Sequence, residues 1–407
     1  MRLVVLSTYD IMPVTSGGQT RYLNIYSRLS TQHDVTIIAY DWQANRSRTY
    51  HVNPKLKVIV PAVLAEDAAM FLHVLQRTNR HTHDAQCIRG YKFSQEFHHA
   101  LRTAISSADV VIASHPFLAL VAFGYCTDHA TKVYEAHNVE LDARAAYYRG
   151  TSDPTVTSPL LEDVQFGERL AAHEADYVTA VSPSDADRFV ELYGLPLSKI
   201  AIVPNGVDVA SYPVLDRRDK QLIRDQLSLG NKPLGVFVGS RYMPNVEAYL
   251  RIRMMLAEAQ YSGTVALIGT MKDGTPDDLA PVPFEERWFG FVEEEVKIVL
   301  LTSADFALQL MYSGAGTNLK LFDYMAARTL IIGNAFGTRG VAGDDWFWRV
   351  ETSEDLRVFL EREPWHTEEG EQIAARARTI AEEQFDWRVI ARGLGRLLTH
   401  GSGALEA

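Results

Sequence analysis

Short apolar runs alternate with longer segments of helical periodicity, and this alternation occurs twice along the chain. The pattern is typical of a parallel β-sheet whose strands are connected by helices. Between the two series lies a stretch rich in Pro, Gly and Asp, PNGVDVASYPVLDRRD, which begins at Pro204 and suits a linker. A length of 407 residues also exceeds what one core usually organises. The sequence therefore predicts two doubly wound α/β domains, at residues 1–210 and 211–385.

The predicted strands are buried apolar runs that end near small or polar residues. In the first half they are Leu3–Leu6, Val35–Tyr40, Val58–Val60, Val110–Ala113, Val133–Ala136 and Val178–Val181, and IAIVPNGVD contains a further strand. In the second half they are Leu234–Gly239, Thr264–Gly269, Phe306–Leu310 and Thr329–Gly333. Ligands bind such sheets beyond the carboxyl ends of the strands, so the loops after these runs are where we look for a site.

Composition excludes several classes of function. The net charge of -11 disfavours a nucleic-acid partner unless a local basic patch exists, and we identify none in the sequence. Cys87 and Cys126 lie far apart without metal-like or redox-like spacing, which argues against a disulfide framework or a zinc site and fits the cytoplasm. No stretch of about 18 apolar residues occurs, so we expect peripheral contact with a membrane at most.

The glycine-rich turn in QLMYSGAGTNLKLFDYMAA is the strongest candidate for a binding site. It leads from a buried strand into a helix that we expect to begin near Asn318. Unhindered backbone amides and the helix start would hold a diphosphate, with the charge of Lys320 beside it. Asp323 suits a ribose, since a carboxylate accepts from two vicinal hydroxyls. The alternative is a turn whose glycines serve packing alone. The predicted donor-binding residues here are Gly314, Ala315, Gly316, Thr317, Asn318 and Asp323.

A diphosphate leaving group needs a second cation when no metal is present. Arg241 follows the first strand of the second domain and is our candidate, with Lys272 in reserve. Asp185 and Asp187 form a DxD pair, but they fall in the first turn of a predicted helix, where acidic residues favour the helix dipole. We therefore predict no metal site.

Two features of the first half point to ligand contacts. Gly17 and Gly18 precede a helix that we expect to begin near Gln19, and they either approach a donor anion or merely form a turn. In YEAHNVE, His137 follows a predicted strand and lies in the loop at its carboxyl end. Asn138 and Glu140 lie in the same segment and are predicted on the acceptor side.

These motifs together resemble the retaining glycosyltransferases of family 4, over nearly the whole chain. The Gly17-Gly18 loop, EAHNVE, VSPSD, VPNGVD, GSRYMPNVEA and SGAGTNLKLFDYMA each resemble a motif of that family, in the same order. The ending EEQFDWRVIARGLGRLL is similar to its terminal helix, expected at about 386–400. The resemblance implies the GT-B fold, with two Rossmann-like domains facing an inter-domain cleft and the terminal helix crossing back to the first domain.

The resemblance also implies the reaction, in which a sugar passes from a nucleoside-diphosphate sugar to an acceptor hydroxyl with retention and without a metal or other cofactor. His137, Arg241 and Lys320 are the implied catalytic residues. Family members often carry two glutamates eight positions apart; here Ala315 and Asp323 occupy those places.

Several questions stay open at the level of sequence. The acceptor is a glycan, a lipid-linked or a small molecule, and the segment Ala65 to Phe97 is expected to shape its pocket. Two alternatives remain: a nucleotide-sugar 2-epimerase and a non-catalytic sugar-nucleotide-binding homologue.

Overall fold

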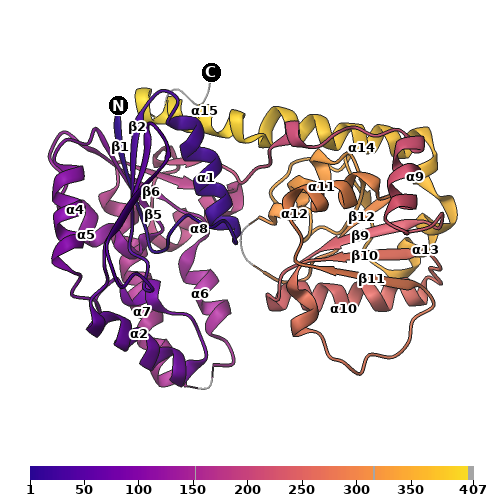
Figure 1. The fold of residues 1–407 in the computed structure, drawn as a ribbon, viewed down its shortest axis with the longest axis horizontal. Helices are drawn as coiled ribbons and strands as arrows, with labels where there is room; N and C mark the ends of the chain where they lie inside the picture. The colour runs from indigo at the N-terminus through magenta and orange to yellow at the C-terminus, as the bar shows by residue number, and fades with distance from the viewer. Residues whose placement is uncertain (152, 315–316, 402–407) are drawn as a thin grey trace. The chain divides into compact units, whose positions relative to one another are not determined.

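The structure is a computed structural model that describes residues 1–151, 153–314 and 317–401 (Figure 1). The chain divides into two compact units. The N-terminal unit comprises Met1–Asn205 and the residues from Arg388 onward, and the C-terminal unit comprises Gly206–Trp387. The last helix thus belongs mostly to the first unit.

The sheet of the N-terminal unit has the strand order β3-β4-β2-β1-β5-β6-β7-β8. Its pairs are parallel except for β3, which runs antiparallel to β4 at the edge. The strands are β1 (Arg2–Ser7), β2 (Asp34–Ala39), β3 (Arg48–Asn53), β4 (Leu56–Val60), β5 (Val110–Ser114), β6 (Thr131–Glu135), β7 (Tyr177–Ala180) and β8 (Ile200–Ile202). Its helices are α1 (Gly17–Leu29), α2 (Ala65–Thr78), α3 (His83–Gln86), α4 (Gln95–Ile105), α5 (Ala119–Phe123), α6 (Glu140–Tyr148), α7 (Pro154–Glu174), α8 (Pro183–Tyr193) and most of α15 (Trp387–His400).

The sheet of the C-terminal unit is parallel throughout, in the order β11-β10-β9-β12-β13-β14. The strands are β9 (Leu234–Val238), β10 (Thr264–Ile268), β11 (Glu285–Gly290), β12 (Phe306–Gln309), β13 (Leu330–Gly333) and β14 (Trp348–Arg349). The helices are α9 (Arg217–Gln226), α10 (Met243–Glu258), α11 (Glu294–Ser303), α12 (Leu319–Ala326), α13 (Ser353–Arg362) and α14 (Glu368–Ile380).

Each face of this second sheet is covered by helices, which explains its continuous apolar strands. Alternate strand residues point to opposite faces. Val236 and Ala307 pack in one core layer with α11 and α12, and Phe237 and Leu308 pack in the other with α10. Figure 1 shows α11 and α12 on one face of the sheet and α10 on the other.

The predicted α/β fold with two parallel sheets is confirmed, and every predicted strand is present within a residue or two of its expected bounds. The prediction missed β3, β11 and β14. Edge strands such as β3 (RTYHVN) and β11 (EERWFG) are polar and partly exposed, so they lack the apolar run on which the prediction relied.

The strand orders fix where ligands can bind. The chain enters each sheet at a central strand and later returns on that strand's other side, so the order reverses between β1 and β5 and between β9 and β12. Crevices for ligands in such sheets form at this reversal, beyond the carboxyl ends of the two strands. The relevant loops follow β1 and β5 in one unit and β9 and β12 in the other.

Candidate functional site

In the C-terminal unit, the loop after β12 leads into the start of α12. Gly314 has φ 118°, a conformation that favours glycine. Ala315 and Gly316 lie outside the described residues. Asn318 is the N-cap of α12, but its side chain makes no capping hydrogen bond, and its buried Nδ2 has no partner among the described residues. The first turn of α12 contains no acidic residue. This helix start therefore presents at least one donor, Asn318 Nδ2, that no acceptor in the described residues satisfies.

Lys320 lies one residue into α12 and is buried, with only 8% of its surface exposed. Its Nζ donates to Asn245 Oδ1 at 2.8 Å and lies 4.3 Å from the centroid of the Phe237 ring. It pairs with no carboxylate in the described parts of the chain. Burial lowers the pKa of Lys320 to about 7. A buried cation without a counter-charge is costly, which suggests that an anion completes the site.

Arg241 follows β9 and is exposed, and its backbone N–H donates to Thr270 Oγ1 at 3.1 Å. The Asn245 side chain links this loop to Lys320, because its Nδ2 donates to Ser240 Oγ at 3.2 Å while its Oδ1 accepts from Lys320. The structure thus brings the Arg241 loop and Lys320 to one edge of the C-terminal sheet. The reserve candidate Lys272 is exposed, with its Nζ 5.8 Å from the Trp288 ring centroid.

The sequence prediction missed a third cation at this edge, Arg339. Its Nη1 donates to Phe336 O at 2.7 Å and its Nη2 to Gly314 O at 3.4 Å. The neighbouring Gly340 has φ 92°, and a Cβ there would lie 2.6 Å from Thr317 Cγ2, so this loop packs closely on the predicted donor loop. The arginine in GNAFGTRG, the loop after β13, could have indicated this cation from the sequence.

Asp323, expected to bind a ribose, already has two protein partners. Tyr212 Oη donates to its Oδ1 at 2.8 Å, and Lys297 Nζ lies 3.1 Å from its Oδ2. These donors fix the carboxylate, and further hydroxyls have only its remaining lone pairs to use.

In the N-terminal unit, Gly17 and Gly18 are the first residues of α1, two positions earlier than the expected start. Ser16 caps the helix by accepting from Gln19 N at 3.3 Å. A Cβ on Gly18 would lie 2.2 Å from Tyr9 Oη, so close packing of Tyr9 explains this glycine.

His137 lies beyond β6 and is buried at 8% exposure. Its Nε2 is 2.9 Å from Ser114 Oγ, which in turn donates to Glu135 Oε2 at 2.7 Å. Since the single hydroxyl proton of Ser114 goes to the carboxylate, Ser114 accepts from Nε2–H, and Nδ1 is the acceptor nitrogen of His137. Burial, together with the nearby His115, lowers the pKa of His137 to about 4, so the ring is neutral at pH 7.

The sequence prediction missed His115, which lies beside His137. The centroids of the two rings are 4.1 Å apart. It follows β5, and its backbone has φ 65° and ψ 159°, a region that residues other than glycine adopt at a cost of roughly 1–3 kcal/mol. Its Nδ1 is 2.9 Å from Glu140 Oε1, while its buried Nε2 has no partner among the described residues. Strain and an unsatisfied nitrogen at a strand end are features of functional residues.

Glu140 holds His115 in place through a hydrogen bond. It is buried, and its Oε2 accepts from Arg144 Nε at 3.3 Å; Asn138 Nδ2 lies 3.4 Å from its Oε1. Burial opposes its ionisation, but the bond from His115 and the charge of Arg144 outweigh it and keep the pKa of Glu140 at about 2. The predicted acceptor-side residue Glu140 is thus hydrogen-bonded to His115 and Arg144.

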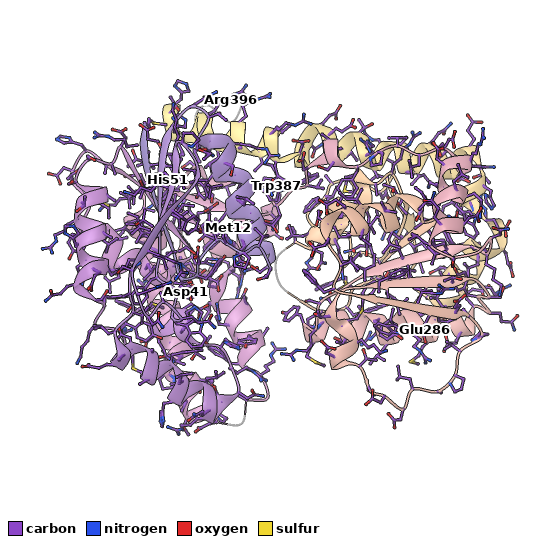
Figure 2. The ribbon with its side chains drawn as sticks, in the orientation of Figure 1. Met12, Asp41, His51, Glu286, Trp387 and Arg396 are labelled. Carbon is purple, nitrogen blue, oxygen red and sulfur yellow. The ribbon has the colours of Figure 1, made fainter. Side chains whose placement is uncertain are left out.

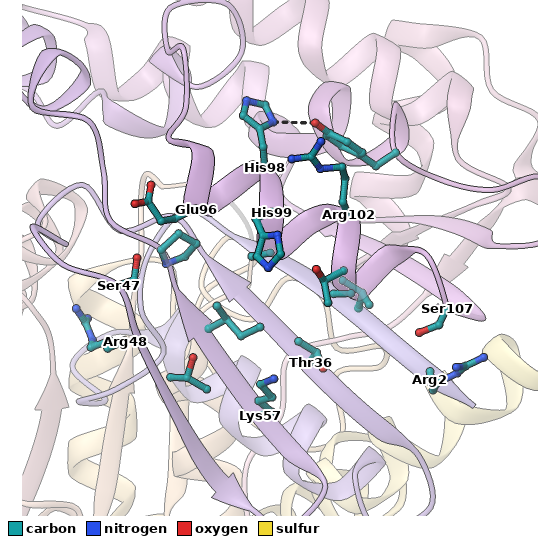
Figure 3. A pocket seen from close by; sticks show the side chains of 18 of the residues that line it. Arg2, Thr36, Ser47, Arg48, Lys57, Glu96, His98, His99, Arg102 and Ser107 are labelled. Carbon is teal, nitrogen blue, oxygen red and sulfur yellow. Dashed lines mark hydrogen bonds between the residues drawn. The ribbon is translucent and has the colours of Figure 1, made fainter.

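A cavity with a volume of about 1350 Å³ lies elsewhere in the N-terminal unit (Figure 3). It is formed by α4 and the sheet and reaches the amino ends of β1 and β2 at Arg2 and Asp34. Its lining mixes both charges, and His98 Nδ1 is already paired with Tyr125 Oη at 2.9 Å. It includes none of the predicted site residues, which follow the carboxyl ends of the strands.

The described residues offer neither a cluster of metal ligands nor a membrane-spanning helix. Among residues 1–151, 153–314 and 317–401, no group of three or more His, Cys, Asp or Glu side chains is arranged to hold a metal ion. Asp185 of the DxD pair accepts from Ser182 Oγ at 2.8 Å, within the N-terminal cap of α8. No helix in the described parts of the chain is long and apolar enough to cross a bilayer.

Comparisons with known proteins agree with this geometry. Residues 15–211 match the family model for Glycosyltransferase Family 4. No curated protein matches the sequence. Among solved structures, the sucrose-phosphate synthase of Thermosynechococcus elongatus has a TM-score of 0.70 at 14% identity, with 98% of each chain covered.

Two further solved structures are similar over the whole chain. The UDP-forming trehalose-phosphate synthase of Burkholderia xenovorans, in complex with glucose-6-phosphate, has a TM-score of 0.67 at 12% identity. HepE of Anabaena, in complex with UDP, has a TM-score of 0.64 at 14% identity. Both cover 98% of this chain and 100% of their own. The N-terminal unit thus resembles glycosyltransferase family 4 over residues 15–211, and the same two-sheet architecture throughout gives the chain the GT-B fold.

Proposed function

We propose that the chain transfers a glycosyl group from a nucleoside-diphosphate sugar to an acceptor hydroxyl, with retention of the anomeric configuration and without a metal ion. The observation that carries this proposal is Lys320, a buried cation without a carboxylate partner in the described parts of the chain, near the N-cap residue Asn318, whose buried Nδ2 has no partner there. A diphosphate supplies the charge that this edge of the C-terminal unit lacks.

The cations explain how the leaving group departs. In the reaction the bond from the anomeric carbon to the diphosphate oxygen breaks, and negative charge grows on that oxygen. Lys320, Arg241 and Arg339 stabilise this charge, as oriented donors do in other enzymes that develop an anion. This is the role that a divalent ion plays where such side chains are absent.

The histidines of the N-terminal unit provide the contacts to sugar hydroxyls. A new bond forms between the anomeric carbon and the acceptor oxygen, and the acceptor proton passes to the departing phosphate oxygen. His115 Nε2 and the Nδ1 of neutral His137 are acceptors that hold hydroxyl groups in position. Solved structures of the same fold contain UDP and UDP-glucose, which favours UDP-sugars as the donors to test first.

A panel of UDP-, GDP- and dTDP-sugars, each with EDTA, tests donor binding by thermal shift. A donor at about 100 times its Kd adds about 2.7 kcal/mol of stability. We expect stabilisation by one nucleotide class and its loss in Lys320→Met. A panel that stabilises neither protein would contradict the proposal, as would a strict requirement for a divalent ion.

Product analysis separates transfer from the alternatives. With UDP-N-acetylglucosamine alone, a 2-epimerase yields the epimer, whereas a transferase yields only slow hydrolysis. With an acceptor, the coupling constant of the anomeric proton reports whether configuration is retained. Donor binding without transfer or hydrolysis would indicate a non-catalytic homologue.

A further inference from the structure

A groove of about 590 Å³ lies between the C-terminal end of α1 and the helix α15, within the N-terminal unit. Its charged lining consists of arginine and histidine side chains, and no Asp or Glu lines it. We call it the arginine groove, defined by Arg28, His33, Arg388, Arg392, Arg396 and His400.

The arrangement follows from helical geometry. Arg388, Arg392 and Arg396 are four residues apart and therefore lie on one face of α15, over about 12 Å. They are exposed, while apolar neighbours on the helix such as Leu394 are buried. Gly395 lets the helices approach, since a Cβ there would lie 3.3 Å from Leu29 Cδ2 of α1. Figure 2 shows the Arg396 side chain on the outer surface of α15.

The expectation that the chain has no local basic patch is therefore wrong. The sequence contains the arginine spacing, but only the packing of α1 on α15 adds Arg28 and His33 to it. In a chain with a net charge of -11, a groove whose charged lining is entirely basic is the opposite of the average surface.

Local structure does not explain why Arg392 and Arg396 are charged. Arg392 and Arg396 form no ion pair in the described parts of the chain, whereas exposed arginines such as Arg357 lie between carboxylates. Like charges four residues apart destabilise a helix. Arg392 and Arg396 therefore cost stability unless something negative binds them.

We propose that the arginine groove binds phosphate groups. Guanidinium groups present paired donors that match phosphate oxygens. The groove has room for a few phosphates, and the acidic remainder of the chain disfavours a long polyanion. The ligand is the headgroup of an anionic lipid or a soluble phosphorylated molecule. The groove shares no residue with the proposed donor site, whose cations Lys320, Arg241 and Arg339 belong to the C-terminal unit.

The test compares two double variants that remove the same charge. The double variant Arg392→Gln with Arg396→Gln removes two positive charges from the groove, and neither residue forms an ion pair in the described parts of the chain. Arg169→Gln with Arg218→Gln is the control, since both residues are exposed, on α7 and α9, and neither forms an ion pair with a described residue. One arm measures co-sedimentation with vesicles of 30% phosphatidylglycerol in phosphatidylcholine at low salt, and the other measures calorimetric binding of inorganic pyrophosphate.

We expect the groove variant to lose roughly 30-fold in affinity in one arm or both, and the control variant to bind like the unmodified protein. Loss confined to the vesicle arm identifies a lipid headgroup, and loss confined to the pyrophosphate arm identifies a soluble ligand. Equal losses in both variants, or no binding in either arm, would overturn the proposal. The thermal shift caused by the donor sugar should be the same in both variants as in the unmodified protein. This measurement therefore tests the proposed donor site independently of the groove.

Discussion

The candidate sites of the two units differ in how their charges are balanced. In the N-terminal unit, the buried charges of the candidate site have protein partners: Arg21 Nε is 3.3 Å from Glu135 Oε1, and Glu140 is bonded to His115 and Arg144. In the C-terminal unit, Lys320 is buried and donates to an amide oxygen, with no carboxylate partner in the described parts of the chain. The charges of the first site are balanced before a ligand arrives, which suits neutral hydroxyl groups. The second lacks negative charge and suits a diphosphate.

The largest effect is expected from breaking the balanced site. Glu135→Gln should lower the free energy of unfolding by about 3–5 kcal/mol, because Arg21 stays buried without its counter-charge. An amide also accepts fewer of the bonds that Tyr26 and Ser114 donate to Glu135. Urea denaturation measures the change, with the exposed Glu361→Gln as a control that should alter stability little. Equal stability of both variants would show that the pair is not needed for the fold.

Removing the unbalanced charge should have the opposite effect on stability and a large effect on activity. Lys320→Met keeps the length of the side chain, and we expect kcat/KM to fall about 100- to 1000-fold, as for loss of one donor to a developing anion. The ligand-free variant should be at least as stable as the unmodified protein, because an uncompensated buried charge is gone. Lys272→Met, at an exposed lysine, is the matched control. Near-normal turnover of Lys320→Met would remove Lys320 from the mechanism.

A smaller loss of kcat/KM is expected from replacing His115, the histidine with the strained backbone. His115→Asn removes an acceptor for one substrate hydroxyl, and we expect kcat/KM to fall about tenfold with little change in donor affinity. Steady-state kinetics together with donor titration separates the two quantities, and the exposed His129→Asn serves as the control. If donor affinity falls by the same factor as kcat/KM, His115 contacts the donor instead.

The smallest expected effect is the pH dependence of donor affinity, which tests whether Lys320 lacks a counter-charge in the empty site. Burial holds the pKa of Lys320 near 7 in the empty site, and a bound diphosphate raises it, so binding above pH 7 takes up a proton. The affinity for UDP should therefore fall about fivefold between pH 7 and 8, relative to the same measurement on Lys320→Met. Calorimetry in two buffers of different ionisation enthalpy measures the proton uptake. Parallel pH profiles for the two proteins would contradict the assignment.

Much of the architecture followed from local pattern. Buried parallel strands are continuous apolar runs, so Leu234–Val238 and Phe306–Gln309 were visible in the sequence, as were the glycines and helix start before Lys320. Polar edge strands were not, because exposure on one side removes the apolar signal. Strand order was equally invisible, since it depends on which distant segments pair.

The sequence by itself determined the two sheets, the glycine-rich turn and the residue types available to bind a phosphate, because each depends on neighbours within about one helical turn or strand. Only the tertiary structure decided that Lys320 would be buried against Asn245, that Arg339 would reach the Gly314 loop, and that His115 would lie against His137. Burial and pairing are set by residues far apart in the chain. They change the pKa and the partners of a side chain, and with them its chemistry, without changing the local sequence.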